Sequence, residues 1–133
     1  WDAKAKALLI AEVVCSKHAE EIVVFQVSEL TALADFFIFC SAESDPQIRA
    51  IVEAVEGALS KKGDRPIGIE GRESGLWALI DYNDVILHIF KKEARAFYNL
   101  DGLWGDAPQI PLRAPSDEKN LSTKRKRKGS KPV

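Results

Sequence analysis

Two apolar runs and the polar segment between them constrain the fold of this chain most. Residues 76–80 and 85–90 are almost continuously hydrophobic, and Asp81-Tyr82-Asn83-Asp84 separates them. Strands that are apolar on both sides are typical of the centre of a sheet that is covered on both faces. Aspartate and asparagine are favoured in turns because their side chains bond to nearby backbone groups. The segment therefore predicts a hairpin of two central strands.

Helical periodicity predicts three helices around this hairpin, at residues 3–17, 44–62 and 91–103. The second helix has the clearest boundaries. Ser44 followed by Gln47 is the pattern of a capping box, and Gly63 supplies the left-handed position at which helices commonly end. The first helix is amphipathic, so we expect it to lie on a sheet.

Segments rich in β-branched and aromatic residues predict three further strands, at residues 21–27, 35–41 and 66–70. The resulting order is α-β-β-α-β-β-β-α. This order predicts an α/β fold, a mixed α+β domain with a mixed sheet of about five strands flanked by helices.

The length of 133 residues and the hydrophobic content of 46% are enough for one sizeable core. We expect residues 1–112 to form a single domain and residues 113–133, which are polar and basic, to be a disordered tail. No run of about 18 apolar residues occurs, so we expect a soluble, cytoplasmic protein without membrane contact. Cys15 and Cys40 lie far apart in apolar segments. This predicts buried thiols rather than a disulfide or a metal site, and no cofactor.

Charge is unevenly distributed along the chain. Residues 1–112 contain eleven basic and eighteen acidic residues, whereas residues 113–133 contain eight basic and two acidic ones. An acidic body favours a basic partner. The densest basic run consists of Lys124, Arg125, Lys126, Arg127 and Lys128. Without interleaved aromatic residues, this run fits either a non-specific RNA contact or a solubilising tail.

Catalytic interpretations find little support in the pattern. Asp81 and Asp84 resemble a pair that could hold magnesium, but turn chemistry explains them more simply. His88 lies in an apolar strand, near Trp77 if the hairpin closes about Asn83, and a structural histidine is the default interpretation. The sequence indicates no catalytic residue.

Residues 77–104 remain as the candidate functional segment. Tryptophan, tyrosine and arginine are the residue types that dominate protein-binding hot spots, although core packing is a competing account for each aromatic residue. The candidate partner-binding residues are Trp77, Asp81, His88, Arg95, Tyr98 and Trp104. We expect Asp81, Arg95 and Tyr98 to be more exposed than Ile86, Ile89 and Leu103.

The same segment carries a family resemblance. Gly-Ile-Glu-Gly at 68–71, Trp77 with Asp81, Asp-Val-Ile-Leu-His-Ile-Phe at 84–90 and Arg-Ala-Phe-Tyr-Asn-Leu-Asp-Gly-Leu-Trp at 95–104 occur in one order. With them the chain resembles the ribosomal silencing factor, or Iojap, family over about residues 19–107. The resemblance implies a topology similar to nucleotidyltransferases without their catalytic carboxylates.

The resemblance also implies a function. The family binds ribosomal protein L fourteen on the large ribosomal subunit, blocks joining of the small subunit and represses translation when nutrients are short. The six candidate residues match its most characteristic positions. Gln26 and Glu21 replace aspartates and Phe36 replaces a tyrosine, which puts any role for the first strand's carboxylate in doubt. The alternatives are a small magnesium-dependent nucleotidyltransferase and a generic dimerisation module, and we also expect a homodimer when the protein is free.

Overall fold

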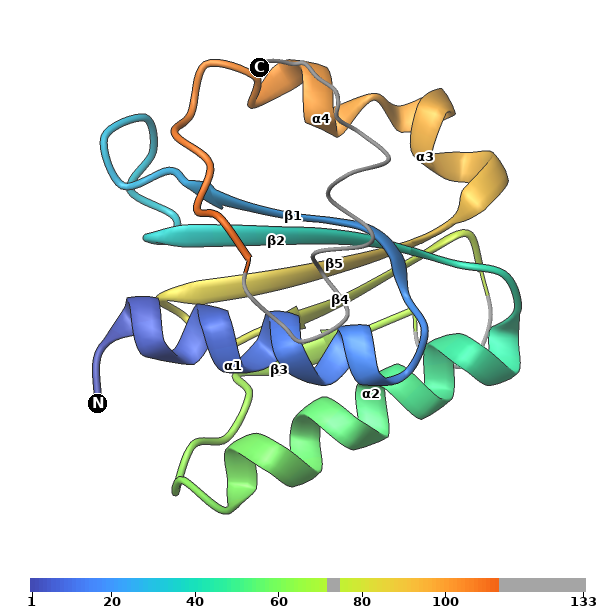
Figure 1. The fold of residues 1–133 in the computed structure, drawn as a ribbon, viewed down its shortest axis with the longest axis horizontal. Coiled ribbons are helices and arrows are strands. Elements are labelled where there is room, and N and C mark those ends of the chain that lie inside the picture. The colour runs from blue at the N-terminus through green and yellow to red at the C-terminus, as the bar shows by residue number, and fades with distance from the viewer. Residues whose placement is uncertain (72–74, 113–133) are drawn as a thin grey trace.

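The computed structural model describes residues 1–71 and 75–112, which form one sheet with helices on both of its faces (Figure 1). Helices α1 and α2 cover one face, and α3 and α4 lie over the other. The elements are α1 (Ala3–Ser16), β1 (Glu20–Gln26), β2 (Phe36–Ala42), α2 (Asp45–Ser60), β3 (Gly68–Glu70), β4 (Trp77–Asp81), β5 (Val85–Lys91), α3 (Lys92–Tyr98) and α4 (Leu100–Leu103).

The five strands are ordered β1-β2-β5-β4-β3 across the sheet. Strands β2 and β5 are parallel and the other neighbours are antiparallel, so the predicted mixed sheet is confirmed. The predicted hairpin is β4–β5, with Trp77 opposite Phe90 and Leu79 opposite His88. This pairing is shifted by one residue from that of a hairpin symmetric about Asn83.

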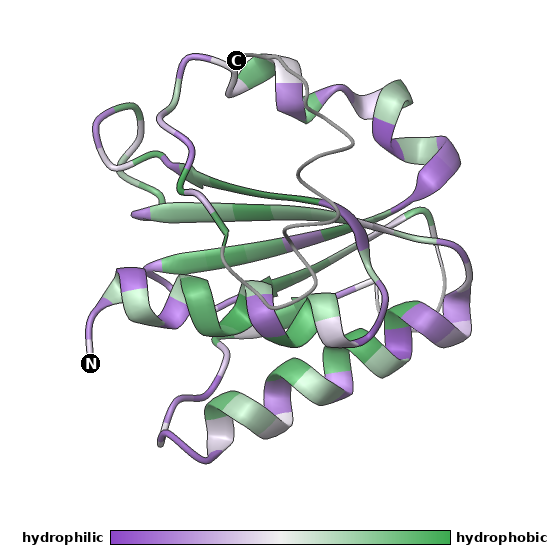
Figure 2. Ribbon diagram, viewed as in Figure 1, coloured by the Kyte–Doolittle hydropathy of each residue, from purple (hydrophilic) through white to green (hydrophobic). Residues whose placement is uncertain are grey.

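The core between the sheet and the first two helices follows the predicted helical periodicity. Helix α2 buries Ile48, Ile51, Val52, Val55 and Leu59, and its apolar inner side is visible in Figure 2. Helix α1 buries Ala7, Ile10, Ala11 and Val14. The caps also form: the Ser44 hydroxyl accepts the backbone N–H of Gln47 at 3.2 Å, as predicted.

One buried lysine ties this helical layer to the hairpin. Lys6 of α1 is 6% exposed and contacts Asp64, after α2, at 2.8 Å and Asp84, in the hairpin turn, at 2.6 Å. Burial disfavours the charged ammonium, but the hydrogen bonds to the two carboxylates outweigh it and raise the pKa of Lys6. The sequence pattern gave no sign of this contact, because its three members are far apart in the chain.

The prediction of a single helix at residues 91–103 is wrong. The backbone at Asn99 is left-handed, with φ of 51° and ψ of 40°, and divides the segment into α3 and α4. Asparagine adopts this conformation more readily than most residues, because its short side chain can bond locally. The break rotates the second half of the segment, and Leu103, which we expected in the core, is 69% exposed.

The segment after α4 closes the β1 edge of the sheet. The Gln26 N–H donates to the Pro108 carbonyl at 2.8 Å, and the Ile110 N–H donates to the Val24 carbonyl at 2.9 Å. The tail expected at residues 113–133, with its basic run, lies outside the described residues. Cys40 is buried and Cys15 half-buried, without a disulfide between them. Within the described part of the chain, the structure contains no helix with the length and apolarity to cross a membrane.

Candidate docking surface

Aromatic side chains gather on the sheet face that lies under α3 and α4. Successive residues of a strand point to opposite faces, so alternate positions of β2, β4 and β5 supply this group. His88 is at its centre, with its ring centroid 5.2 Å from Phe37 and 5.0 Å from Phe39. Trp77 stacks on Phe90 at 5.2 Å. The apolar runs of the sequence thus build a second, aromatic core on this face.

Trp77 and His88 are hydrogen-bonded, as their predicted proximity suggested. The indole Nε1–H of Trp77 donates to Nδ1 of His88 at 3.2 Å. His88 is 7% exposed, and burial lowers its pKa to about 4. The imidazole is therefore neutral at pH 7, and its proton is on Nε2, because Nδ1 acts as the acceptor. His88 is too buried to offer contact area to a partner, and the structural interpretation of this residue fits.

The exposed part of the face lies beside this core. Tyr98 is 37% exposed and its ring lies 5.1 Å from Trp77, which is itself half-buried. Phe97 is 80% exposed and Leu76 is 44% exposed. Trp77, Tyr98 and Phe97 are in successive ring contact and form an apolar surface, which we call the Trp77 surface.

Phe97 was missing from the predicted site. One signal could have found Phe97. Adjacent residues of a helix point about 100° apart, so Phe97 and Tyr98 cannot both face the sheet from a short helix.

Trp104 is partly in the core and partly at the surface. Its ring packs edge-on against Phe37 at 4.9 Å, and the side chain is half-buried. It therefore anchors the end of α4 on the sheet and leaves part of its ring at the surface.

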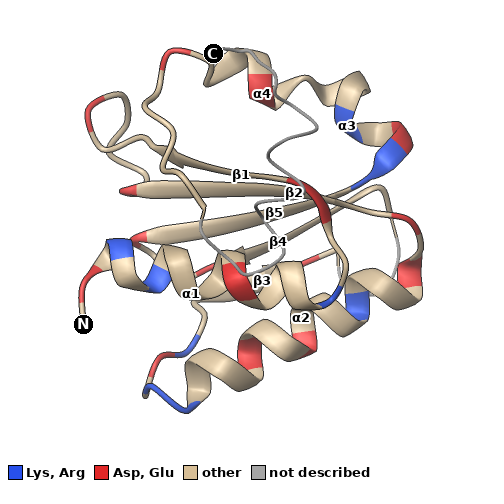
Figure 3. Cartoon of the chain, in the orientation of Figure 1, with Lys and Arg blue, Asp and Glu red and all other residues tan. Residues whose placement is uncertain are grey.

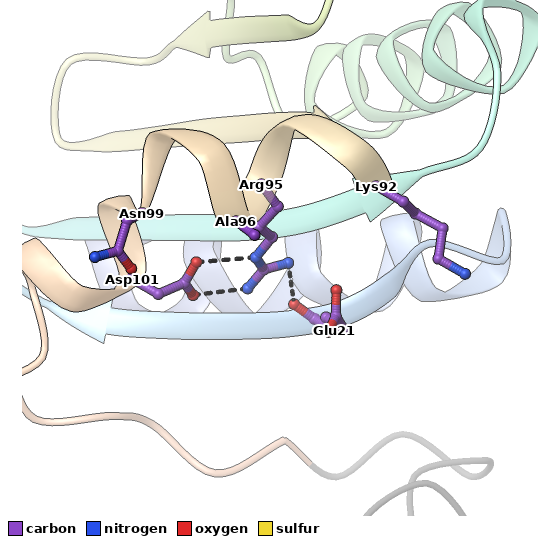
Figure 4. Close-up of a pocket in the computed structure, with 6 residues that line it drawn as sticks. All are labelled: Glu21, Lys92, Arg95, Ala96, Asn99 and Asp101. Carbon is purple, nitrogen blue, oxygen red and sulfur yellow. Dashed lines mark hydrogen bonds and ion pairs between the residues drawn. The ribbon is translucent and has the colours of Figure 1, made fainter.

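Arg95 is buried, whereas we expected it to be more exposed than Leu103. It is 9% exposed, and its guanidinium binds Asp101 through Nε at 2.9 Å and Nη2 at 2.8 Å (Figure 4). Nη1 donates to the Glu21 carbonyl at 2.6 Å and to the Ser41 hydroxyl at 2.9 Å. The Arg95 side chain thus links α3 to α4, β1 and β2. It thereby stabilises the position of α3, which carries Phe97 and Tyr98.

Asp81 lies at the opposite end of β4 from Trp77, about 13 Å away along the strand. Its Oδ1 accepts the backbone N–H of Asn83 at 2.7 Å, which is the predicted turn chemistry. Asp84 is instead bound to Lys6 on the other side of the sheet. Within residues 1–71 and 75–112, no group of three or more His, Cys, Asp or Glu side chains is placed to hold a metal ion.

The fold and this site define a small mixed α/β protein with an apolar, aromatic surface of the kind that docks other macromolecules. A family model described as "Ribosomal silencing factor during starvation" matches residues 2–132. The chain belongs to this family.

Relatives support this assignment over most of the chain. The chain is 38% identical over 104 residues to the ribosomal silencing factor of Halalkalibacterium halodurans. The matched region covers 78% of this chain and 89% of the relative. It is 37% identical over 106 residues to that of Bacillus subtilis, covering 79% and 90%. It is also 35% identical to the chloroplastic Iojap protein of Arabidopsis thaliana, covering 81% of this chain and 45% of that protein.

Solved structures agree in fold. A crystal structure of a Chromobacterium violaceum protein matches with a TM-score of 0.76 and 28% identity, covering 86% of this chain and 97% of the other. A crystal structure from Bacillus halodurans matches with a TM-score of 0.70 and 34% identity, covering 81% and 99%.

Proposed function

We propose that this protein binds the large ribosomal subunit through ribosomal protein L fourteen and blocks association with the small subunit, which represses translation under nutrient limitation. It acts by occupying a surface and not as an enzyme. Its place of action is then the compartment of its ribosomes, which we take to be the cytoplasm.

The observation that carries this proposal is the Trp77 surface on a member of this family. Trp77 and Tyr98 are in ring contact and partly exposed, and Phe97 is largely exposed beside them. Large aromatic side chains of limited flexibility bind partners well, since they bury much area and lose little conformational entropy. Among the described residues, the rings in contact with Trp77 are those of His88, Phe90 and Tyr98, which suit an aromatic binding surface.

The charge of the domain supports a basic partner. The described residues comprise seventeen acidic and ten basic residues, and Figure 3 shows them mainly on the helices and loops, whereas the strands are largely uncharged. Several basic residues are already paired with carboxylates, among them Lys92 with Glu20 at 2.6 Å. The remaining negative charge favours encounter with a basic ribosomal protein over free nucleic acid.

Sedimentation with purified large ribosomal subunits tests the proposal. We expect the wild-type protein to co-sediment stoichiometrically, and Trp77→Ala or Tyr98→Ala to weaken binding about tenfold or more, which corresponds to the loss of a hot-spot residue. Trp1→Ala is the matched control, because Trp1 is 53% exposed and hydrogen-bonds to Asp64, on the side of the sheet that α1 and α2 cover. We expect it to bind normally.

Function is read from the joining of large and small subunits in a sucrose gradient. The wild-type protein should reduce the fraction of joined ribosomes, and Trp77→Ala should not. Failure of the wild-type protein to co-sediment would overturn the proposal, as would equal losses in Trp77→Ala and Trp1→Ala. Crosslinking from a photoreactive group at Tyr98 identifies the partner protein directly.

We propose two additional contacts, one made by the basic run and one made by the Trp77 surface. The basic run at Lys124, Arg125, Lys126, Arg127 and Lys128 makes a non-specific contact with ribosomal RNA, and a chain that ends at residue 112 should then show a smaller salt dependence of binding. The apolar Trp77 surface also supports a homodimer when the protein is free. Sedimentation equilibrium tests this, and Phe97→Ser should shift the protein toward monomer.

A further inference from the structure

We propose that His88 is a positioning residue for the docking surface: its buried imidazole holds the indole of Trp77 in the orientation in which the partner binds it. This inference rests on the proposed function for its consequence in binding. It assigns a role to a residue that the partner does not touch.

The pairing of β4 and β5 sets up the contact. Trp77 stands opposite Phe90, and His88 is two residues before Phe90, so the two side chains are diagonal neighbours on one face. The Trp77 ring rests on Phe90 with an interplanar angle of 27°. Stacking alone does not distinguish the two faces of the indole, which a flip about the Cβ–Cγ bond would exchange. The bond from Nε1–H to His88 Nδ1, at 3.2 Å, removes the freedom to flip.

The imidazole of His88 is itself packed among aromatic rings. Phe37 and Phe39 meet it edge-on at 71° and 81°, and Phe90 lies nearly parallel to it at 9°. The imidazole is oriented by this ring packing and by the bond to Trp77, because its Nε2 is buried without a hydrogen-bond partner among the described residues. Burial lowers the pKa of His88 to about 4, so the acceptor is neutral at pH 7.

A phenylalanine at position 88 would fill the space but accept no hydrogen bond. The indole N–H would then either remain buried without an acceptor or turn toward water. The variant also removes the unpaired Nε2–H of His88, so its main effect is on the orientation of the indole, and turning changes the outline of the Trp77 surface. Without this bond the indole occupies the docking orientation only part of the time, and we expect His88→Phe to weaken large-subunit binding by that fraction, about five- to tenfold for one lost hydrogen bond.

The experiment combines NMR and binding on the full chain. Trp77→Phe assigns the Trp77 indole signal among the three tryptophans. His88→Phe should move that signal upfield and weaken binding to purified large subunits. His88→Asn, whose side-chain oxygen can occupy about the place of Nδ1, should restore part of both. In a Trp77→Phe background, which has no indole N–H to orient, His88→Phe should have no further effect on binding.

The wild-type protein gives a test that needs no variant to fold. The long-range ¹⁵N spectrum of the imidazole must show the Nε2–H tautomer at pH 7, and the Nδ1–H tautomer would overturn the inference. An unmoved Trp77 signal in folded His88→Phe would also overturn it. Unchanged binding of His88→Phe, while Trp77→Ala binds weakly, overturns the inference and leaves the proposed function standing. Absence of wild-type binding instead refutes the proposed function, and the tautomer and indole signals still decide the positioning.

Discussion

Arg95 and Asp101 form a two-point ion pair across the break between α3 and α4, with Nε–Oδ1 and Nη2–Oδ2 distances of 2.9 and 2.8 Å. The pair bridges the left-handed Asn99, so it holds α4 against the sheet where the helix itself is interrupted. The Arg95 guanidinium also bonds to Glu21 in β1 and Ser41 in β2, so both sides of the break are linked to these strands. The Trp77 surface depends on this internal support, because α3 carries Phe97 and Tyr98.

Arg95→Lys should destabilise the protein by about 1–3 kcal/mol, because a lysine can make only a one-point bond to Asp101 and cannot also reach the Glu21 carbonyl and the Ser41 hydroxyl. The free energy of unfolding in urea measures this. Lys92→Ala is the control in the same helix: Lys92 is 46% exposed in its side chain, and we expect its loss to change the unfolding midpoint little. Equal midpoints for Arg95→Lys and the wild type would contradict the prediction.

Asn99 should prefer glycine to alanine as a replacement. Its φ of 51° costs an alanine about 1 kcal/mol, whereas glycine adopts this conformation freely. Asn99→Ala should therefore lower the free energy of unfolding by about 1 kcal/mol, and Asn99→Gly should be close to neutral. Thermal unfolding of the two variants under the same conditions distinguishes them, and the reverse order would show that the Asn99 side chain matters more than its backbone.

Gly71 is required both for its backbone conformation and for its lack of a Cβ. Gly63 has the same backbone conformation without the close contact, so it allows the two reasons to be distinguished. Both have a φ of +78°, but a Cβ at Gly71 would overlap the carbonyl oxygen of Trp77, whereas a Cβ at Gly63 meets nothing within 4 Å. Gly63→Ala should cost about 1 kcal/mol from the backbone alone. Gly71→Ala should cost about 3 kcal/mol or more, since the start of β4 must also move. Similar losses in urea unfolding would show that this contact relaxes without cost.

Stability should fall between pH 6.5 and pH 4 through His88. Its pKa is about 4 in the folded protein and about 6.5 when unfolded, so in this range the unfolded chain binds a proton that the folded protein does not. The expected loss is about 3 kcal/mol on going from pH 7 to pH 4. Other groups titrate as well, so the measured quantity is the difference between wild type and His88→Phe. If that difference does not change with pH, His88 is not buried as a neutral base.

The sequence predicted the architecture well where local rules decide. The apolar runs, the Ser44 cap and the α2 stripe led to the correct order of elements and a mixed sheet of five strands. It predicted the last helix poorly, since helical spacing at residues 91–103 continues through Asn99. Whether an asparagine continues a helix or breaks it depends on the neighbours that α4 finds on the sheet.

The candidate site shows the same division. The sequence by itself determined which residue types gather between Trp77 and Trp104, and the hairpin placed Trp77 beside His88. Only the tertiary structure decided their roles, turning Arg95 and His88 inward and Phe97 and Leu103 outward. The physical reason is that core and docking surface use the same side chains. Burial is set by long-range contacts, such as the bond from Arg95 to the Glu21 carbonyl, which no local pattern encodes.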